Sequence, residues 1–282
     1  MIGESLWGAP PWLIILVVTL LLMGSHEVGV QIRRRFRYRI LKDQDAEGVG
    51  GSYLTASLSL LALLVAFSFG MAVDRFNTRR NLVLQEANAI ASSYRRLETL
   101  DGATRDAVGR GLLDYVAARE AFSRSTTLKQ LALAESHTDA AQARLWTSLV
   151  QARGASQLAE HASLEAADAM FHVAAARRAA LEAVVPGSVL YGMLLYAAIA
   201  ALLMGYSHPI DRRFLIPSSV QFVLLAIALA LIVDLDRPRS GLVQVSQAPL
   251  LRVTEVIRRS EAARGSEPEM KAPTAAARRA PD

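Results

Sequence analysis

Four long apolar stretches divide the chain. A helix that crosses a bilayer needs about 20 mostly apolar residues, and residues 11–30, 53–73, 187–206 and 214–233 meet this condition. No charged residue interrupts the last three, whereas the first carries His26 and Glu27 near its end. Glu4, and no Lys or Arg, precedes the first stretch, which is unlike the basic start of a signal peptide. The pattern predicts four transmembrane helices.

The long polar insert, residues 74–185, has helical periodicity throughout. Residues 71–101 contain no Gly or Pro, so the second stretch should continue beyond the membrane as one helix over 53–98. Two apolar stripes at helical spacing follow, one formed by Val108, Leu112, Tyr115 and Phe122 and the other by Leu128, Leu131, Leu145 and Leu149. Pro186 and Gly187 should end the last helix before the third span. The insert therefore predicts an antiparallel helical bundle outside the membrane.

The segment after the fourth span changes character twice. "LVQVSQ" alternates apolar and polar residues and predicts a short extended strand, whereas residues 249–263 predict an amphipathic helix. From residue 265 onward the chain has few apolar residues to bury and is expected to be disordered. The predicted organisation is a first span with a basic loop (1–52), a second span (53–73), the bundle (74–185), the third and fourth spans (186–235), a post-membrane segment (236–264) and a tail (265–282).

The bulk composition fits this mixed design. The chain has 52% hydrophobic and 20% charged residues, which is too apolar for a typical soluble domain and too charged for a wholly membrane-embedded one. The net charge of +5 comes from arginines beside apolar runs, which indicates contact with membrane lipid, and no nucleic-acid partner is expected. Cysteine is absent, which excludes disulfides, zinc–thiolate sites and thiol catalysis.

Basic residues predict the orientation. Short loops rich in Lys and Arg stay in the cytoplasm, and "RRRFRYRILK" follows the first span while Arg212 and Arg213 lie between the third and fourth. Both termini and the bundle would then face the periplasm, with the protein in the inner membrane. Other arginines oppose this by flanking the insert: Arg75, Arg79, Arg80, Arg177 and Arg178. The dense first loop favours the periplasmic placement.

Charged residues end the second and fourth spans. Ionisable groups are costly in hydrocarbon, so Asp234, Asp236 and Arg237 first indicate a membrane boundary, with Asp234 and Arg237 close enough to pair at i and i+3. If the protein assembles symmetrically, the same residues could form a charged ring at a pore mouth. Asp74 and Arg75 end the second span on the same predicted side, so the two clusters are expected to meet.

Two further carboxylates are candidates. Glu27 could reach interfacial water, pair with Arg33 or Arg34, or face a cavity as a cation or proton site. Glu86 shares a helix face with residues that should be packed, whereas Asn88 points elsewhere. A buried carboxylate needs a partner, so an inter-helix hydrogen bond at Glu86 is expected ahead of a binding site.

Sites for metals and catalysis are not predicted. His161, Glu165, Asp168 and His172 share one helix face, but one face cannot surround a metal ion, and a solvated surface is the expected interpretation. The sequence contains no G-x-S-x-G, P-loop, G-x-G-x-x-G or H-E-x-x-H motif. We expect neither an enzyme nor a bound cofactor.

Three segments together resemble a known family. "HEVGVQIRRR", "LLALLVAFSFGMAVDRFNTRRNLVLQEANAIASSYRR" and "DLDRPRSGLVQVSQAPL" are similar to the bacterial bestrophin-like membrane proteins, over about residues 12–255. The family's pattern falls on Glu27, Gly29, Asp74, Arg75, Glu86, Asn88, Asp234, Asp236, Arg237, Pro238 and Gly241. True bestrophins are pentameric chloride channels with a cytosolic insert, so the resemblance implies a homo-oligomer and an inorganic ion, and it implies the opposite side for the bundle.

The sequence therefore predicts an all-α membrane protein with four spans and a bundle between the second and third. Two functions remain open: a homo-oligomeric ion channel, or a non-conducting envelope or sensory protein whose bundle binds a partner. Conduction needs a wet helix face, for which Ser57 and Ser68 on one side of the second span, with Ser59 off it, are the modest candidates.

Overall fold

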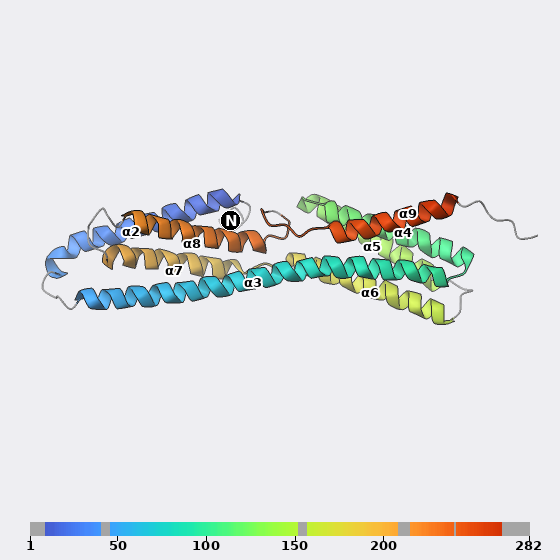
Figure 1. The fold of residues 1–282 in the computed structure, drawn as a ribbon, viewed down its shortest axis with the longest axis horizontal. Helices are drawn as coiled ribbons and strands as arrows, with labels where there is room; N and C mark the ends of the chain where they lie inside the picture. The colour runs from blue at the N-terminus through green and yellow to red at the C-terminus, as the bar shows by residue number, and fades with distance from the viewer. Residues whose placement is uncertain (1–8, 41–45, 152–156, 208–214, 240, 267–282) are drawn as a thin grey trace, which may run out of the picture. The chain divides into compact units, whose positions relative to one another are not determined.

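The structure is a computed structural model that describes residues 9–40, 46–151, 157–207, 215–239 and 241–266. These residues are helical apart from short connections, and they form no strand. The helices are α2 (Pro11–Ile40), α3 (Ala46–Arg96), α4 (Gly102–Arg124), α5 (Leu128–Gln151), α6 (Gln157–Glu182), α7 (Gly187–Ser207), α8 (Leu215–Asp236) and α9 (Ala248–Ser266), with a 3₁₀ turn η1 (Leu97–Thr99) (Figure 1).

The chain forms two compact units. Unit 1 comprises residues 1–81 and 177–245, and unit 2 comprises residues 82–176 and 246–282. Helices α3 and α6 therefore contribute to both units, while α9 belongs to unit 2.

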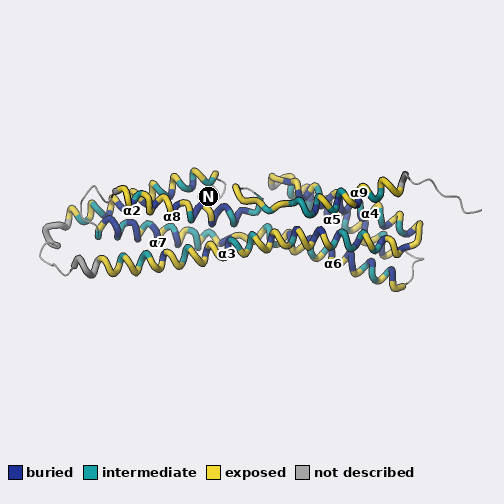
Figure 2. Tube along the Cα trace, viewed as in Figure 1, coloured by how far each residue is buried: buried dark blue, intermediate teal, exposed yellow. Residues whose placement is uncertain are grey.

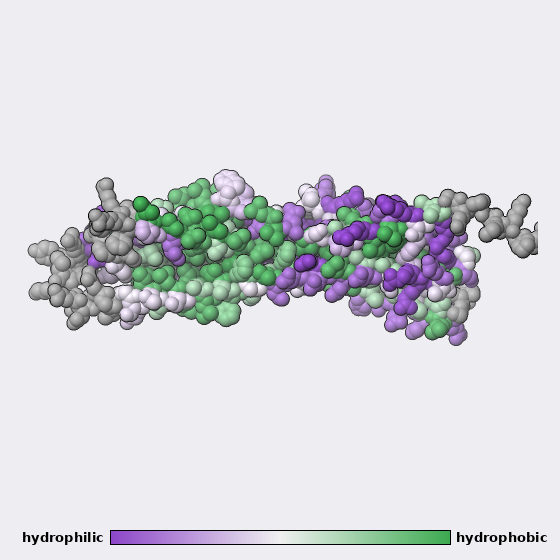
Figure 3. Space-filling view, in the orientation of Figure 1, coloured by the Kyte–Doolittle hydropathy of each residue, from purple (hydrophilic) through white to green (hydrophobic). Residues whose placement is uncertain are grey.

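Unit 1 contains the four apolar helices. Helix α2 packs along α7 and α8 around an apolar core that includes Leu22, Leu61, Ala200 and Ile232. Within the part of the chain that the structure describes, four helices are long and apolar enough to cross a membrane. Large apolar side chains are also exposed on this unit, among them Trp12, Leu20, Phe67, Leu195 and Leu224, and the face over α2 and α8 is mostly hydrophobic (Figure 3). Such a surface suits contact with lipid.

Two glycines let α2 and α7 approach closely. A Cβ built at Gly29 on α2 would overlap the carbonyl oxygen of Leu202, and one at Gly205 on α7 would overlap that of His26. Small residues at crossing points allow backbone contact between membrane helices. The contact gives a physical reason for Gly29, which the family resemblance had singled out.

The helices of unit 2 pack through amphipathic faces. The stripe predicted for α4 is buried as expected, with Val108, Leu112, Tyr115 and Phe122 in the core. Leu145 and Leu149 of α5 are also buried, Leu131 is half-buried, and the side chain of Leu128 lies outside the described residues. Buried and exposed positions alternate along α4 and α5 (Figure 2). The N-terminus of α4 is capped by Asp101, whose carboxylate accepts a hydrogen bond from the Thr104 amide at 3.0 Å.

The predicted helix boundaries agree with the structure for α3 and α7 and differ for α2. The single helix predicted over 53–98 is confirmed as far as Arg96, since α3 is continuous from Ala46 to Arg96, and its last two residues belong to the 3₁₀ turn η1. Helix α7 begins at Gly187 as predicted. Helix α2 continues to Ile40, ten residues past the predicted end of the span, because nothing in the basic segment breaks a helix.

The segment after the fourth span confirms one prediction and contradicts another. The amphipathic helix predicted over 249–263 is present as α9. The strand predicted for "LVQVSQ" is wrong: residues 242–247 are irregular. Alternation alone does not make a strand without a neighbouring strand to complete its hydrogen bonds. Of the tail predicted to be disordered, Gly265 and Ser266 end α9, and residues 267–282 lie outside the described residues.

Candidate functional site

Arg79 lies at the centre of a polar cluster in unit 1. Its buried guanidinium donates hydrogen bonds to the carbonyls of Ala180 (3.1 Å), Ala183 (2.8 Å) and Leu235 (3.3 Å). These carbonyls lie at the C-terminal ends of α6 and α8, where the last four carbonyls of a helix lack intrahelical partners. A cation is also favoured there by the helix dipoles. Arg79 of α3 thus supplies hydrogen-bond donors to carbonyls at the C-terminal ends of two other helices.

Asp236 is the acidic member of the same cluster. Its buried carboxylate accepts from the Val185 amide at 2.8 Å and from Arg75 Nη1 at 3.4 Å. The predicted meeting of the charged ends of the second and fourth spans is therefore confirmed for Arg75 and Asp236. Asp74 is exposed and takes no part in this ion pair.

Asp234 orders the turn that follows α8. Its carboxylate accepts from the amides of Leu242 (2.9 Å) and Val243 (3.0 Å). Gly241, between them and the helix, has a φ of 152°, and a Cβ there would lie 2.6 Å from Asp234 Oδ1. The glycine is therefore required both by its backbone conformation and by space.

Arg237 is the basic residue of the charged motif at the end of α8, beside Asp234 and Asp236. Burial lowers the pKa of its guanidinium, and the nearby Asp234 carboxylate opposes this change. The buried contacts of Asp234 and Asp236 support the boundary interpretation of the "DLDR" motif. A pore-mouth role for Asp234, Asp236 and Arg237 stays a prediction.

Glu86 and Arg119 form a buried ion pair in unit 2. The Arg119 Nε atom donates to Glu86 Oε1, and the guanidinium carbon lies 4.3 Å from the centre of the Phe122 ring. The inter-helix hydrogen bond predicted for Glu86 is confirmed, between α3 and α4. Asn88 is exposed, in agreement with its predicted position off the packed face.

Glu27 is exposed near the middle of α2 and accepts a hydrogen bond from Gln31 Nε2 at 3.4 Å. Arg33 donates to the carbonyls of Tyr206 (3.3 Å) and Ser207 (2.9 Å) at the end of α7. Of the alternatives for Glu27, its exposure favours contact with interfacial water.

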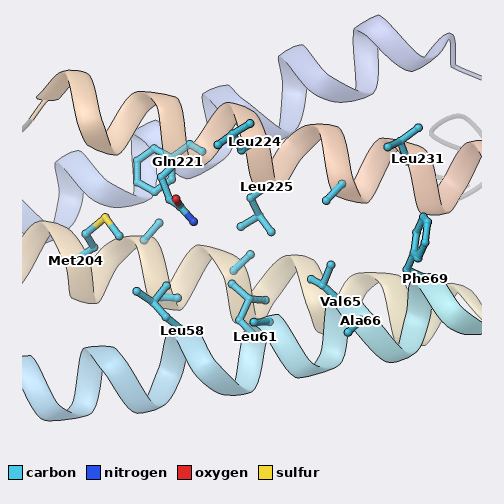
Figure 4. Close-up of a pocket in the computed structure, with 16 residues that line it drawn as sticks. Leu58, Leu61, Val65, Ala66, Phe69, Met204, Gln221, Leu224, Leu225 and Leu231 are labelled. Carbon is cyan, nitrogen blue, oxygen red and sulfur yellow. The ribbon is translucent and has the colours of Figure 1, made fainter.

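An apolar groove of about 490 Å³ lies between α3, α7 and α8 (Figure 4). Its lining includes Leu58, Leu61 and Val65 of α3, together with alanines of α7, and Gln221 of α8 directs its amide into the groove. In the part of the chain that the structure describes, no hydrogen bond to that amide is present. The groove has no arrangement of groups suited to chemistry.

The side of α3 that carries Ser57 and Ser68 is packed in part, and whether any face of α3 meets water stays a prediction. Ser68 is buried and its hydroxyl donates to Met193 Sδ at 2.8 Å, and Ser57 is only half-exposed. Ser59, which the sequence placed off that side, is exposed. Small and polar residues lie along one exposed face of α3 at steps of three and four residues: Thr55, Ser59, Ala62, Ala66, Gly70, Asp74, Asn77 and Asn81. Ala62 and Ala66 of this face also line the apolar groove. We call this face the α3 stripe.

The histidines and carboxylates of α6 lie on the surface, as their shared face suggested. His161, Glu165, Asp168 and His172 are exposed, with His172 Nε2 at 3.5 Å from Asp168 Oδ2. Among the described residues no group of three or more metal-binding side chains is present.

Sequence reasoning missed three residues of these sites. Arg79 was considered only as one of the positive charges that flank the insert. It lies four residues after Arg75, which places both side chains on the same helix face. Arg119 carried no signal beyond an arginine within an apolar stripe, four residues after Tyr115. Gly205 lies in an apolar run in which nothing marks a close approach.

The described residues define a class: a helical membrane protein with four helices that are long and apolar enough to cross a bilayer. A family model for the bestrophin-like domain matches residues 13–250, so the chain belongs to the bestrophin-like family. The matched residues include the charged motifs at the ends of the second and fourth spans and the segment around Glu86, so the family resemblance is confirmed.

Solved structures agree on the fold. A bacterial bestrophin homologue from Klebsiella pneumoniae with a tryptophan-to-alanine substitution is 14% identical, with a TM-score of 0.66 over 93% of this chain and all of the other. A structure of a bacterial bestrophin homologue from the same organism, phased with zinc, is 16% identical, with a TM-score of 0.62 over 91% of this chain and 99% of that one. No curated protein matches the sequence.

Proposed function

We propose that the chain assembles into a symmetric homo-oligomer that conducts ions across the inner membrane, with the α3 stripe lining the pathway. Membership of the bestrophin-like family supports a channel. The observation that carries the proposal is the stripe itself, because its small and polar residues are exposed on a helix whose other exposed residues include Leu60, Leu63 and Phe67.

The stripe suits a pore more than lipid. Hydroxyl, amide and carboxylate groups facing hydrocarbon are unfavourable, whereas the same groups facing water or a permeating ion are satisfied. Ala62, Ala66 and Gly70 in its middle leave room where larger side chains would close a narrow axial path. Copies of α3 around an axis would place these residues toward one another and the large apolar residues toward neighbours and lipid.

Single cysteines test this assignment directly, because the natural chain has none. Purified protein in liposomes is expected to show ion flux, and a methanethiosulfonate reagent should block flux in Ser59→Cys, Ala66→Cys and Asn77→Cys. Leu60→Cys and Phe67→Cys, on another exposed side of the same helix, are the matched controls and should be insensitive. No flux in any gradient would reject the channel; equal sensitivity at all five positions would reject the stripe as its lining.

The orientation is part of the proposal. The basic loop after α2 supports a cytoplasmic position for that end of the spans and a periplasmic position for unit 2, whereas the bestrophin resemblance implies a cytosolic unit 2. A reporter active only in the cytosol, inserted between Gln151 and Gln157, should stay inactive. Strong cytosolic activity would reverse the orientation without affecting the conduction test.

The non-conducting alternative makes a different prediction. An envelope or sensory protein would assemble and fold normally but give no flux in the wild-type chain, with the cysteine variants silent for that reason. Measuring the oligomer size of the same sample separates this outcome from a failure to assemble.

A further inference from the structure

A pocket of about 510 Å³ opens between α5 and α6 in unit 2. It is lined by Asp139, Gln142, Ala143 and Trp146 from α5 and by Asp168 and Phe171 from α6. Neither lysine nor arginine is part of its lining, although the whole chain has a net charge of +5. The pocket therefore combines two carboxylates with two aromatic rings.

The aromatic rings form a row from the core outward. Tyr115 of α4 is fully buried, its ring centre lies 5.5 Å from that of Phe171, and Phe171 lies 6.4 Å from Trp146. Both pairs are tilted, at 58° and 57°, as aromatic pairs prefer. Because Phe171 is held by a buried neighbour, it gives the pocket a fixed wall. Trp146 is 41% exposed, so its large indole is available at the mouth.

The carboxylates come from both helices. Asp139 and Asp168 lie at the pocket, and both are exposed to solvent. A cation placed between the two helices would be attracted by both charges and by the electron-rich faces of the rings. Gln142 adds an amide that can donate or accept a hydrogen bond.

The chemistry distinguishes among cations. A divalent metal ion prefers a shell of six or more oxygen ligands, and no group of three or more metal-binding side chains occurs among the described residues. An ammonium ion that carries methyl groups buries those groups against aromatic rings and needs only diffuse negative charge around it. We infer that this pocket binds a small organic cation of the quaternary ammonium class.

The test compares two ligands of the same shape. Choline carries the charge, and 3,3-dimethylbutan-1-ol replaces its nitrogen with carbon. Saturation-transfer NMR on the methyl groups of each ligand, with the full-length protein in detergent, reports weak binding. Choline should bind, and the neutral analogue should bind at least about five-fold more weakly. Equal binding of the two ligands, or none of choline, would overturn the inference.

Variants locate the site. Trp146→Leu keeps an apolar side chain but removes the aromatic face, and it should weaken choline binding by about five-fold; Trp12→Leu, on α2, is the control. The double variant Asp139→Asn with Asp168→Asn should weaken binding further, whereas Asp106→Asn, exposed on α4, should not. Unchanged choline affinity in Trp146→Leu would show that choline binds elsewhere and would contradict the proposed site. Circular dichroism of each variant checks that the helices remain intact.

Discussion

Arg119 donates a hydrogen bond to Glu86 in the interior of unit 2, where the Glu86 side chain is wholly buried and that of Arg119 is 3% exposed. A buried ion pair is not by itself a source of stability, because both charges lose their hydration on burial. Its energetic consequence appears when one partner is removed and the other charge remains. The pair therefore adds little net stability while it is intact, although breaking it is costly.

Removing either partner alone should be strongly destabilising. Glu86→Leu or Arg119→Met leaves one buried charge uncompensated and should lower the free energy of unfolding by about 3–5 kcal/mol. The double variant should recover most of that loss. Thermal unfolding followed by circular dichroism gives the comparison, and a double variant that is as unstable as both single losses added together would contradict this account.

The carbonyl contacts of Arg79 make a second prediction. Arg79→Met leaves three carbonyls at the ends of α6 and α8 without their donor, at a cost of about 3 kcal/mol or more. Arg79→Lys should recover only part of it, because an ammonium lacks the planar fork of donors. Arg80→Met, one position away and exposed, is the matched control and should leave the unfolding temperature unchanged.

Local signals explain which parts of the fold the sequence predicts. Gly and Pro positions define where α3 continues and where α7 begins, and apolar spacing identifies the buried face of α4, because both depend on residues near in sequence. The meeting of the charged ends of the second and fourth spans was also accessible, since both clusters were predicted on the same side of the membrane; the particular pair, Arg75 with Asp236, comes from the structure.

Local sequence signals do not predict which backbone groups a side chain contacts, or which of two similar residues is exposed. Carbonyls of Ala180 and Ala183 have no distinctive side chain, so nothing in the sequence shows that Arg79 would reach them. Ser59 and Ser68 look alike in an apolar span, and only the packing of α7 buries one and leaves the other exposed. The prediction for "LVQVSQ" was wrong because a strand depends on a neighbouring strand, and the described residues contain none.

Asp74 is the charged member of the α3 stripe and should influence ion selectivity. In a symmetric channel its copies would form a ring of negative charge, which favours cations over anions at that level. Asp74→Asn should lower the cation-to-anion permeability ratio in liposomes, more at low salt than at high salt because exposed charges are screened. Asp106→Asn is the control; a ratio unchanged by Asp74→Asn would remove Asp74 from the pathway.

The cap of α4 should make unit 2 sensitive to acid. The hydrogen bonds from Thr104 hold the pKa of Asp101 below its ordinary value of 3.8. A carboxyl whose pKa is depressed on folding stabilises the fold above its unfolded pKa, and this contribution disappears as the pH falls through the folded value. Asp101→Asn keeps an acceptor at the cap without an ionisable group, so its unfolding temperature should fall less steeply than that of the wild type between neutral and strongly acidic pH. Parallel curves for the two proteins would show that the cap charge does not contribute.

Gly205 and Gly192 lie on the same helix but differ in their surroundings, which allows a matched test of the α2–α7 contact. A Cβ at Gly205 would overlap the carbonyl oxygen of His26, whereas a Cβ at Gly192 meets nothing within 4 Å. Gly205→Ala must push the two backbones apart and should cost about 1–3 kcal/mol. Gly192→Ala should leave stability unchanged or raise it slightly, since alanine is the better helix former. Thermal unfolding in detergent measures both, and equal effects of the two substitutions would show that helix propensity, and not the close approach of α2, is what these glycines determine.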